Sequence, residues 1–279
     1  MTNKQVGLIL YSKVDIEKNK SFVTMFQEDF LPYNIEIRLV IVEEINDYAK
    51  WAAGLLESTQ NGEKNIFAIN RSRNWLIAKA LETNGIRVFN NSKVTKIANN
   101  KKENYLFLKG VVTYMDIIED EENQTFAYPY IIKSCKGHGG SEVFMVKNDV
   151  EEKQALSCIE GDYVIQKPCS DLGKDVRVYV LGNKIVKAVL RTSKDSFKSN
   201  FSLGGKVREY ILNDYEISMV KKILEKLSID YGGIDFIFHH NKVVFNEIED
   251  AVGARMLYQC TDIDIVKLYT QYILNEISI

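Results

Sequence analysis

The chain has 279 residues, of which 46% are hydrophobic and 27% charged, the balance of an ordinary globular protein rather than a disordered one. Its 36 lysines and arginines against 38 aspartates and glutamates give a formal net charge of −2, which offers no electrostatic basis for a nucleic-acid partner. The four cysteines match no zinc or redox spacing, and no run approaches the roughly 18 apolar residues of a membrane span, so we expect a reduced, cytoplasmic protein without a membrane partner.

Strand-like and helix-like patterns alternate along the first third of the chain. Helical spacing of apolar residues predicts helices over residues 17–30, 46–56 and 75–84, the last closed by Gly85 as a glycine cap. Apolar, β-rich runs predict strands over residues 5–11, 35–42, 65–70 and 86–89. Strands that alternate with helices predict a parallel sheet, so residues 1–90 are expected to form a small α/β lobe.

From about residue 90 the pattern changes to mixed α+β. One helix is expected over residues 93–109, and a strand over residues 128–133 runs into the glycine-rich residues 136–140. Two later helices are expected over residues 215–227 and 263–277. The remaining strands are expected over residues 163–167, 176–181, 184–190, 233–239 and 243–248. We therefore place the main domain boundary near residue 90.

Three carboxylates lie on two neighbouring strand patterns, Asp235 on the first and Glu247 and Glu249 on the second. Residues two apart on a strand share a face, so Glu247 and Glu249 point the same way. A hairpin with a three-residue loop, which sets His239 opposite Val243, also sets Asp235 opposite Glu247 and gathers the three acids on one face. Hard oxygen ligands of this kind suit Mg²⁺. The alternative is ordinary solvent-facing charge on an edge hairpin.

A glycine-rich segment follows the strand that ends in Lys133. Gly137, Gly139 and Gly140 free the backbone for a close approach to a ligand, and the N–H groups of such a loop, with a lysine beside them, can hold phosphate oxygens. The segment is not a P-loop, because the pattern G-x-x-x-x-G-K-[ST] is absent. A glycine-rich hairpin turn without a ligand is the equal alternative.

A third polar stretch runs from residue 174 to residue 205. Asp175 and Arg177 lie on one face of a predicted strand. Arg191 and Asn200 belong to a segment rich in cations and small residues that ends in two glycines. A long polar loop of this kind is either functional or an ordinary surface loop.

Taken in order, these segments resemble the RimK-like branch of the ATP-grasp enzymes, amino-acid ligases related to the enzyme that adds glutamate to a ribosomal protein. The resemblance covers residues 65–260, and the order and spacing of the motifs carry it more than any single motif. It implies an ATP-grasp fold behind a Rossmann-like pre-ATP-grasp lobe at residues 1–90. Residues 91–168 are then a small subdomain with a glycine-rich lid, and residues 169–279 a large subdomain with the metal site.

The resemblance also implies a role for each matching position. Lys101 and Lys133 match the lysines on the α- and β-phosphates, and residues 136–141, with their three glycines, match the lid over the phosphates. The adenine hinge matches Gln166, Lys167, Pro168 and Cys169, and the ribose-binding acid matches Asp175. The polar groups that face the acyl-phosphate match Arg177, Arg191 and Asn200. The magnesium ligands match Asp235, Glu247 and Glu249.

The activity implied by the resemblance is an ATP-dependent ligation, in which a carboxylate is activated as an acyl-phosphate and then joined to an amine. ATP and Mg²⁺, or Mn²⁺ in its place, are the implied cofactors, and an amino acid or a peptide is the implied substrate. A carrier protein or protein C-terminus as substrate, and a homo-oligomeric state, stay open. The alternatives are a ligase with another acceptor, of the D-alanine or peptide-natural-product kind, and an ATP-binding regulator that has lost catalysis.

The last motif departs from the family pattern. Its usual form is E-x-N followed by a small residue, proline and glycine, whereas here Glu249 replaces the asparagine and Val252 the proline. A carboxylate at that position can still bind Mg²⁺ and adds a negative charge, which leaves the substrate class open. Arg71 and Arg73 lie just after a predicted strand, where they face either the cleft or solvent.

Overall fold

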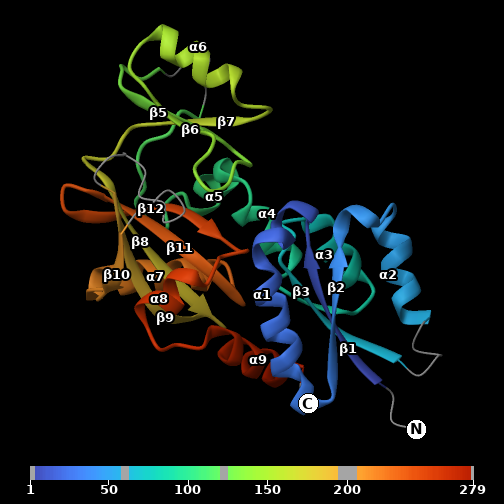
Figure 1. The fold of residues 1–279 in the computed structure, drawn as a ribbon. Helices are drawn as coiled ribbons and strands as arrows, with labels where there is room; N and C mark the ends of the chain where they lie inside the picture. Colours follow the sequence, from blue (N-terminus) through green and yellow to red (C-terminus); the bar gives the residue numbers. More distant parts are fainter. Residues whose placement is uncertain (1–3, 58–62, 120–124, 194–205, 278–279) are drawn as a thin grey trace.

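The structure is a computed structural model that describes residues 4–57, 63–119, 125–193 and 206–277. Three sheets follow one another along the chain, and the first is parallel with the strand order β2-β1-β3-β4 (Figure 1). Its strands are β1 (Lys4–Tyr11), β2 (Ile35–Ile41), β3 (Glu63–Asn70) and β4 (Arg87–Phe89). The predicted parallel sheet is confirmed.

Helices connect the strands of this N-terminal lobe. They are α1 (Lys13–Phe30), α2 (Tyr48–Glu57) and α3 (Trp75–Thr83), with the single turns η1 (Leu31–Tyr33) and η2 (Val42–Glu44). Gly85 follows α3 with a φ of 76°, the left-handed conformation expected of a glycine that closes a helix.

Helix α1 packs against the C-terminal helix of the chain. Ser12 caps its first turn by accepting the N–H of Asp15. Phe26 lies on its buried face and packs edge-on against Tyr269 of α9 (Ile265–Glu276), with 5.7 Å between the ring centroids. Figure 1 shows α1 and α9 side by side. The C-terminal helix therefore packs on the N-terminal lobe.

The single helix expected over residues 93–109 is wrong, because the structure has two, α4 (Ser92–Ala98) and α5 (Lys101–Leu108). Asn99 ends the first helix, and Asn100 begins the second, where its side chain accepts two backbone N–H groups of the first turn. Asparagine favours such caps because its side chain replaces the missing backbone partner. The break places Lys101 at a helix start, and its backbone N–H donates to the carbonyl of Cys135 at 2.9 Å.

The second sheet is small and antiparallel, with the order β6-β5-β7. Its strands are β5 (Tyr130–Ser134), β6 (Val143–Val146) and β7 (Tyr163–Gln166), and α6 (Asp149–Ser157) covers one face. Tyr130, Ile132, Val146 and Ala155 form a separate hydrophobic core beneath that helix. This unit has its own core, and the predicted subdomain over residues 91–168 stays a prediction.

The third sheet is antiparallel, with the order β10-β9-β8-β11-β12. Its strands are β8 (Asp171–Leu181), β9 (Lys184–Thr192), β10 (Lys206–Tyr210), β11 (Tyr231–His239) and β12 (Lys242–Glu249). The helix α7 (Asp214–Lys226) buries Val220 and Ile223 in the core on one face. The short helix α8 (Arg255–Cys260) belongs with α9 to the core on the other face.

The N-terminal lobe is fixed to the third sheet at the start of β11. The side chain of Asn90 accepts the N–H of Asp230 at 2.8 Å and donates to the carbonyl of Tyr231 at 2.6 Å. Arg87 pairs with Asp230 at 2.5 Å. A domain boundary near residue 90 stays a prediction. In the part of the chain that the structure describes, no helix has the length and apolar character to cross a membrane.

Candidate functional site

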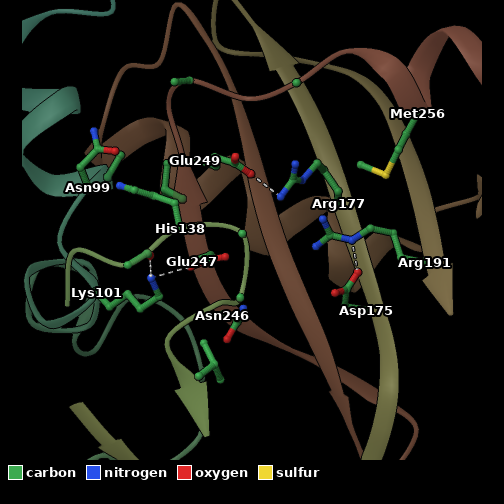
Figure 2. Close-up of a pocket in the computed structure, with 18 of the residues that line it drawn as sticks. Asn99, Lys101, His138, Asp175, Arg177, Arg191, Asn246, Glu247, Glu249 and Met256 are labelled. Atoms are coloured by element: carbon green, nitrogen blue, oxygen red, sulfur yellow. Dashed lines mark hydrogen bonds and ion pairs between the residues drawn. The ribbon is translucent and has the colours of Figure 1, made fainter. Parts of the chain in front are cut away.

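One cavity of about 530 Å³ lies where the three sheets meet. Residues of the N-terminal lobe, of the small sheet and of β8, β9 and β12 line it. Figure 2 shows Glu247 and Glu249 with Arg177, Arg191 and Asp175 around this space. The polar segments singled out in the sequence therefore converge on a single cavity.

The acidic hairpin has the predicted pairing at its functional end, but a different turn. Asp235 lies opposite Glu247, as expected, whereas His239 lies opposite Lys242 and not Val243. The loop has two residues, His240 and Asn241, both with a positive φ. The prediction of a three-residue loop is therefore wrong.

A register shift between Asp235 and Phe236 reconciles the correct pairing with the shorter loop. Asn246 is the additional residue on β12, because its neighbours Phe245 and Glu247 oppose Phe236 and Asp235. A regular strand would turn Asn246 and Glu247 to opposite faces. Because of the bulge, both line the cavity. Sequence reasoning missed Asn246 because a bulge has no reliable signature.

Two buried arginines connect three acids in one network. Arg177 donates to Asp235 through Nε at 2.8 Å and Nη2 at 2.7 Å, and it also pairs with Glu249. Arg191 donates to Asp235 at 2.6 Å and pairs with Asp175. Burial opposes the ionisation of Asp235, but the two guanidiniums outweigh it and lower the pKa to about 2. These arginines are therefore rigidly held.

The three acids differ in how they could serve a metal ion. Asp235 is 1% exposed, does not line the cavity and accepts three N–H groups. Glu247 and Glu249 line the cavity and have 30% and 27% of their side chains exposed. Burial raises the pKa of Glu249, although Arg177 acts against the shift. No group of three metal-binding side chains is found among the residues that the structure describes.

These observations fit a Mg²⁺ ion at Glu247 and Glu249 better than one at all three acids. Magnesium usually takes one or two carboxylates and completes its shell with water and phosphate oxygens. Two carboxylates open to the cavity suffice for that pattern. Asp235, whose oxygens are already occupied by guanidinium groups, does not fit it in this arrangement.

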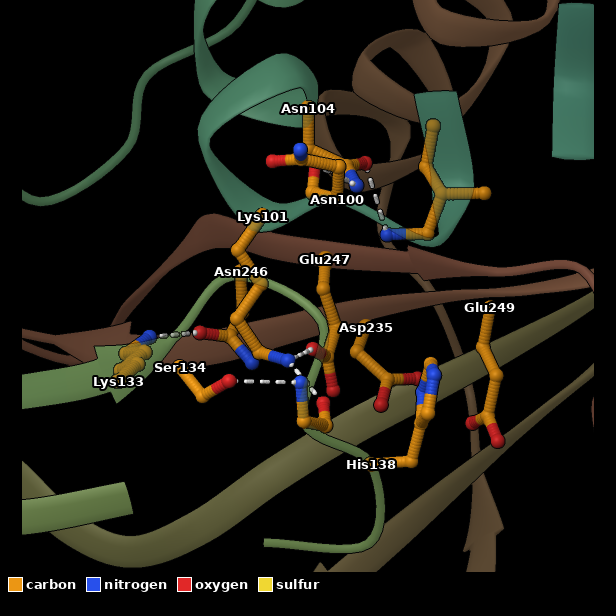
Figure 3. A network of polar contacts seen from close by, with 12 residues as sticks. Asn100, Lys101, Asn104, Lys133, Ser134, His138, Asp235, Asn246, Glu247 and Glu249 are labelled. Carbon is orange, nitrogen blue, oxygen red and sulfur yellow. Dashed lines mark hydrogen bonds and ion pairs between the residues drawn. The ribbon is translucent and has the colours of Figure 1, made fainter. Parts of the chain in front are cut away.

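Lys101 and Lys133 both reach the cavity, as predicted. Lys133 is buried and donates to the side chain of Asn246 at 3.0 Å (Figure 3). Its burial lowers the pKa to about 8, against a smaller opposite effect of Glu247. Lys101 lies 3.5 Å from Glu247 and donates to the carbonyl of Gly137 at 2.5 Å.

The glycine-rich segment lies over these lysines. Gly137, Gly139 and Gly140 line the cavity, and the last two have φ angles of 66° and 77° that side chains rarely adopt. His138, which sequence reasoning did not single out, also lines it. Burial lowers the pKa of His138 to about 4, with Arg73 acting in the same direction, so the imidazole is neutral at pH 7.

The positions assigned to adenine and ribose are only partly brought together. Gln166 and Cys169 line the cavity, whereas Lys167 does not and pairs with Asp116 at 2.9 Å. Asp175 is 6% exposed and is held by Arg191, which leaves it poorly suited to bind ribose hydroxyls. Asp171, at the start of β8, also lines the cavity, and its carboxylate accepts from the Ser170 hydroxyl and the Asn241 N–H. Asn200 lies outside the described residues.

The two arginines after β3 face the cleft, which decides between the alternatives that the sequence left open. Arg71 and Arg73 both line the cavity. Arg71 is 3% exposed, and Arg73 pairs with Asp15 at the start of α1.

Comparisons with known proteins show which family this chain resembles. The model of the RimK-like ATP-grasp domain matches residues 66–273. The uncharacterized protein MG011 of Mycoplasma genitalium is 30% identical over 285 residues, which cover 99% of this chain and 94% of that protein. N-acetylaspartylglutamate synthase A of Homo sapiens is 29% identical over 160 residues, which cover 56% of this chain and 41% of that protein.

Among solved structures, D-alanine–D-alanine ligase from Bacillus anthracis complexed with ATP superposes with a TM-score of 0.73. The superposition covers 99% of this chain and 97% of the ligase, at 13% sequence identity. Similarity at this level of identity establishes the fold and leaves the chemistry to the residues of the cavity.

Proposed function

The chain belongs to the RimK-like ATP-grasp family, and on this premise we propose that it is an ADP-forming ligase that joins a carboxylate to an amine. ATP and Mg²⁺ are the proposed cofactors, and an amino acid or a peptide is the proposed substrate. One observation carries the proposal most. Lys101 and Lys133 meet Glu247 and Glu249 around one cavity, beneath a glycine-rich loop.

The phosphates of ATP are proposed to lie between the two lysines and the glycine-rich loop. Lys133 is pre-oriented by Asn246 and Lys101 by the carbonyl of Gly137, so both amino groups already face the cavity. A phosphate oxygen gives a desolvated lysine a stronger partner than a neutral amide or carbonyl oxygen does. For the other end of ATP, we propose Gln166 and Cys169 at the adenine and Asp171 at the ribose.

Glu247 and Glu249 are proposed to hold Mg²⁺. The ion would neutralise charge on the β- and γ-phosphates and polarise the transferred phosphoryl group. Lys101 lies 3.5 Å from Glu247, so that lysine and carboxylate orient each other before the nucleotide binds. Asp235 acts through the arginines that it positions, not as a ligand.

Arg177 and Arg191 are proposed to bind the reacting carboxylate and then the acyl-phosphate. Both line the cavity, and buried acids fix their orientation. Cationic groups fixed in advance stabilise developing negative charge without having to reorganise during the reaction. Because Arg177 and Arg191 are tied to the same carboxylate of Asp235, they act as one unit.

The proposed reaction has two steps. A carboxylate oxygen of the first substrate attacks the γ-phosphorus of ATP. The bond between that phosphorus and the β,γ-bridging oxygen breaks, and ADP leaves. The nitrogen of the amine attacks the acyl carbon, the bond to the phosphate oxygen breaks, and phosphate and a proton are released. The glycine-rich loop, with a neutral His138, shields the acyl-phosphate from water.

The proposal is tested by ADP release from Mg·ATP with a mixture of the amino acids and short peptides, followed by the mass of the product. Glu247→Gln is expected to slow ADP release by about ten- to a few hundredfold, the effect of losing one charged contact. Glu209→Gln is the matched control, because Glu209 lies on β10 in a half-exposed pair with Lys187. Wild-type ADP release by Glu247→Gln would contradict the assignment.

One observation favours a second function, that of an ATP-binding protein without turnover. Each of the three predicted metal-binding acids is paired with a lysine or an arginine. Such a protein binds Mg·ATP with an increase in melting temperature, yet gives no ADP with any substrate of the mixture.

A further inference from the structure

Arg71 is a buried cation at the wall of the cavity, with one nitrogen left unpaired. Its Nε donates to the hydroxyl of Tyr11 at 3.1 Å, and its Nη2 donates to the carbonyls of Ala251 and Val252 at 3.2 and 2.8 Å. Its Nη1 is buried and has no hydrogen-bond partner among the described residues. Hydrogen bonds therefore hold two of the three guanidinium nitrogens, and the third has no partner in the described part of the chain.

An unpaired N–H on a buried guanidinium is unfavourable and calls for an explanation. The rings of Phe22, Tyr11 and Tyr231 surround the guanidinium, with its central carbon 5.0, 5.9 and 5.9 Å from their centroids. An aromatic ring gives a guanidinium only a weak contact, so these rings leave Nη1 without a hydrogen-bond partner within the described ranges. The second arginine of this wall, Arg73, also has a buried unpaired nitrogen, its Nε.

The surroundings of Arg71 have a surplus of positive charge on an apolar wall. Asp15, the acid of α1 that lines the cavity, is already paired with Arg73. The apolar residues that line the cavity from α1 and α8 are Phe22, Met25, Met256 and Tyr258. Met256 lines the same cavity as Arg177 and Arg191 (Figure 2), so this wall belongs to the cavity that holds the site proposed for the acyl-phosphate. An anion with an apolar body fits it.

We propose that Arg71 binds the free carboxylate of the amine substrate, which is an amino acid or peptide with an apolar side chain. The inference rests on the proposed function. ATP and its leaving phosphate occupy the side of Lys101 and Lys133, so the amine approaches the acyl carbon from the other side. That side belongs to α1, α8 and Arg71. Because Nη1 is buried in this structure, the side chains that cover it must shift when the carboxylate pairs with it.

Hydroxylamine separates this inference from the proposed function. It attacks an acyl-phosphate and carries no carboxylate, so it needs no contact with Arg71. Wild-type protein is incubated with Mg·ATP, a mixture of amino acids, short peptides and di- and tricarboxylic acids, and hydroxylamine. Formation of a hydroxamate supports the acyl-phosphate, whereas its absence overturns the proposed function itself.

The carboxylate is then tested with the wild-type protein, without any variant. Each of the amino acids and a set of dipeptides is offered as the amine beside its own carboxamide, such as leucine beside leucinamide. We expect the free acids to be used at least about tenfold better than the amides, with leucine preferred to glutamate. Hydroxamate formation combined with equal use of amides, a preference for glutamate, or use of no amine in the panel would overturn the inference.

Arg71→Gln tests the residue, with Arg208→Gln on the exposed edge of β10 as the control. The rate with the preferred amino acid, divided by the rate with hydroxylamine, is expected to fall about ten- to hundredfold, as for the loss of one hydrogen bond between charged groups. A merely structural defect lowers both rates together and leaves the ratio unchanged. An unchanged ratio in a folded variant therefore contradicts the role of Arg71.

Discussion

Asp235→Asn is expected to destabilise the protein, whereas Glu247→Gln is expected to slow turnover and leave stability nearly unchanged. Asp235 is 1% exposed and accepts three N–H groups from Arg177 and Arg191 at 2.6–2.8 Å. An asparagine offers one acceptor oxygen instead of two and turns an NH₂ group toward the guanidinium donors. Breaking a buried ion pair from one side costs about 3–5 kcal/mol, a large share of the 5–15 kcal/mol that typically holds a protein folded.

That loss corresponds to a fall in melting temperature of roughly 6–20 °C, at about 2–4 °C per kcal/mol for a chain of this size class. Glu247 is 30% exposed on its side chain, and its ion pair with Lys101 spans 3.5 Å, so Glu247→Gln is expected to change stability by less than about 1 kcal/mol. Melting curves and ADP release are measured on both variants. If Asp235→Asn melted within about 2 °C of wild type, the structural role assigned to Asp235 would be refuted.

Three further predictions concern pH and the hairpin turn. Lys133, with its pKa lowered to about 8, must be protonated to bind phosphate, so kcat/KM for ATP is expected to fall as pH rises through about 8. In Lys133→Arg the fall in kcat/KM is expected to occur at a higher pH. Asp235 has a pKa lowered to about 2, so the stability it adds is complete above about pH 4 and is lost as pH falls through about 2; acid melting curves of Asp235→Asn should lack this part of the decline. Asn241 has a φ of 60°, so Asn241→Gly is expected to keep the urea midpoint while Asn241→Val costs about 1–2 kcal/mol.

Much of the fold could be predicted because its signals are local. The strands and helices before residue 90 alternate, and such alternation allows few arrangements other than a parallel sheet. The pairing of Asp235 with Glu247 followed from a hairpin of nearly the correct length. Arg177 and Arg191 were brought to one site by their order along adjoining strands, where Arg177 pairs with Val189 and Asp175 with Arg191.

Three features could not be predicted from the sequence: the bulge in β12, the break between α4 and α5, and the unpaired nitrogen of Arg71. The bulge at Asn246 adds one residue to β12, and the two-residue turn at the other end of the hairpin compensates for it. A helical pattern over residues 93–109 does not reveal the break at Asn99 and Asn100, because asparagine is also tolerated inside helices. The unpaired nitrogen of Arg71 depends on the distant loop that supplies its other partners, so no pattern near residue 71 indicates it.

Glu249 changes the charge of the cavity in a way that bears on which ligands it holds. Asp175, Asp235 and Glu249 carry three negative charges against the two positive charges of Arg177 and Arg191, whereas the family's asparagine in place of Glu249 would leave the network balanced. Burial raises the pKa of Glu249, whereas the two arginines lower the pKa of Asp235, so they stabilise the charge of Glu249 less than that of Asp235. A cation that enters the cavity, either Mg²⁺ or the ammonium group of a substrate, removes this imbalance. The replacement therefore strengthens the cavity's preference for a cation beside Arg177 rather than abolishing the site.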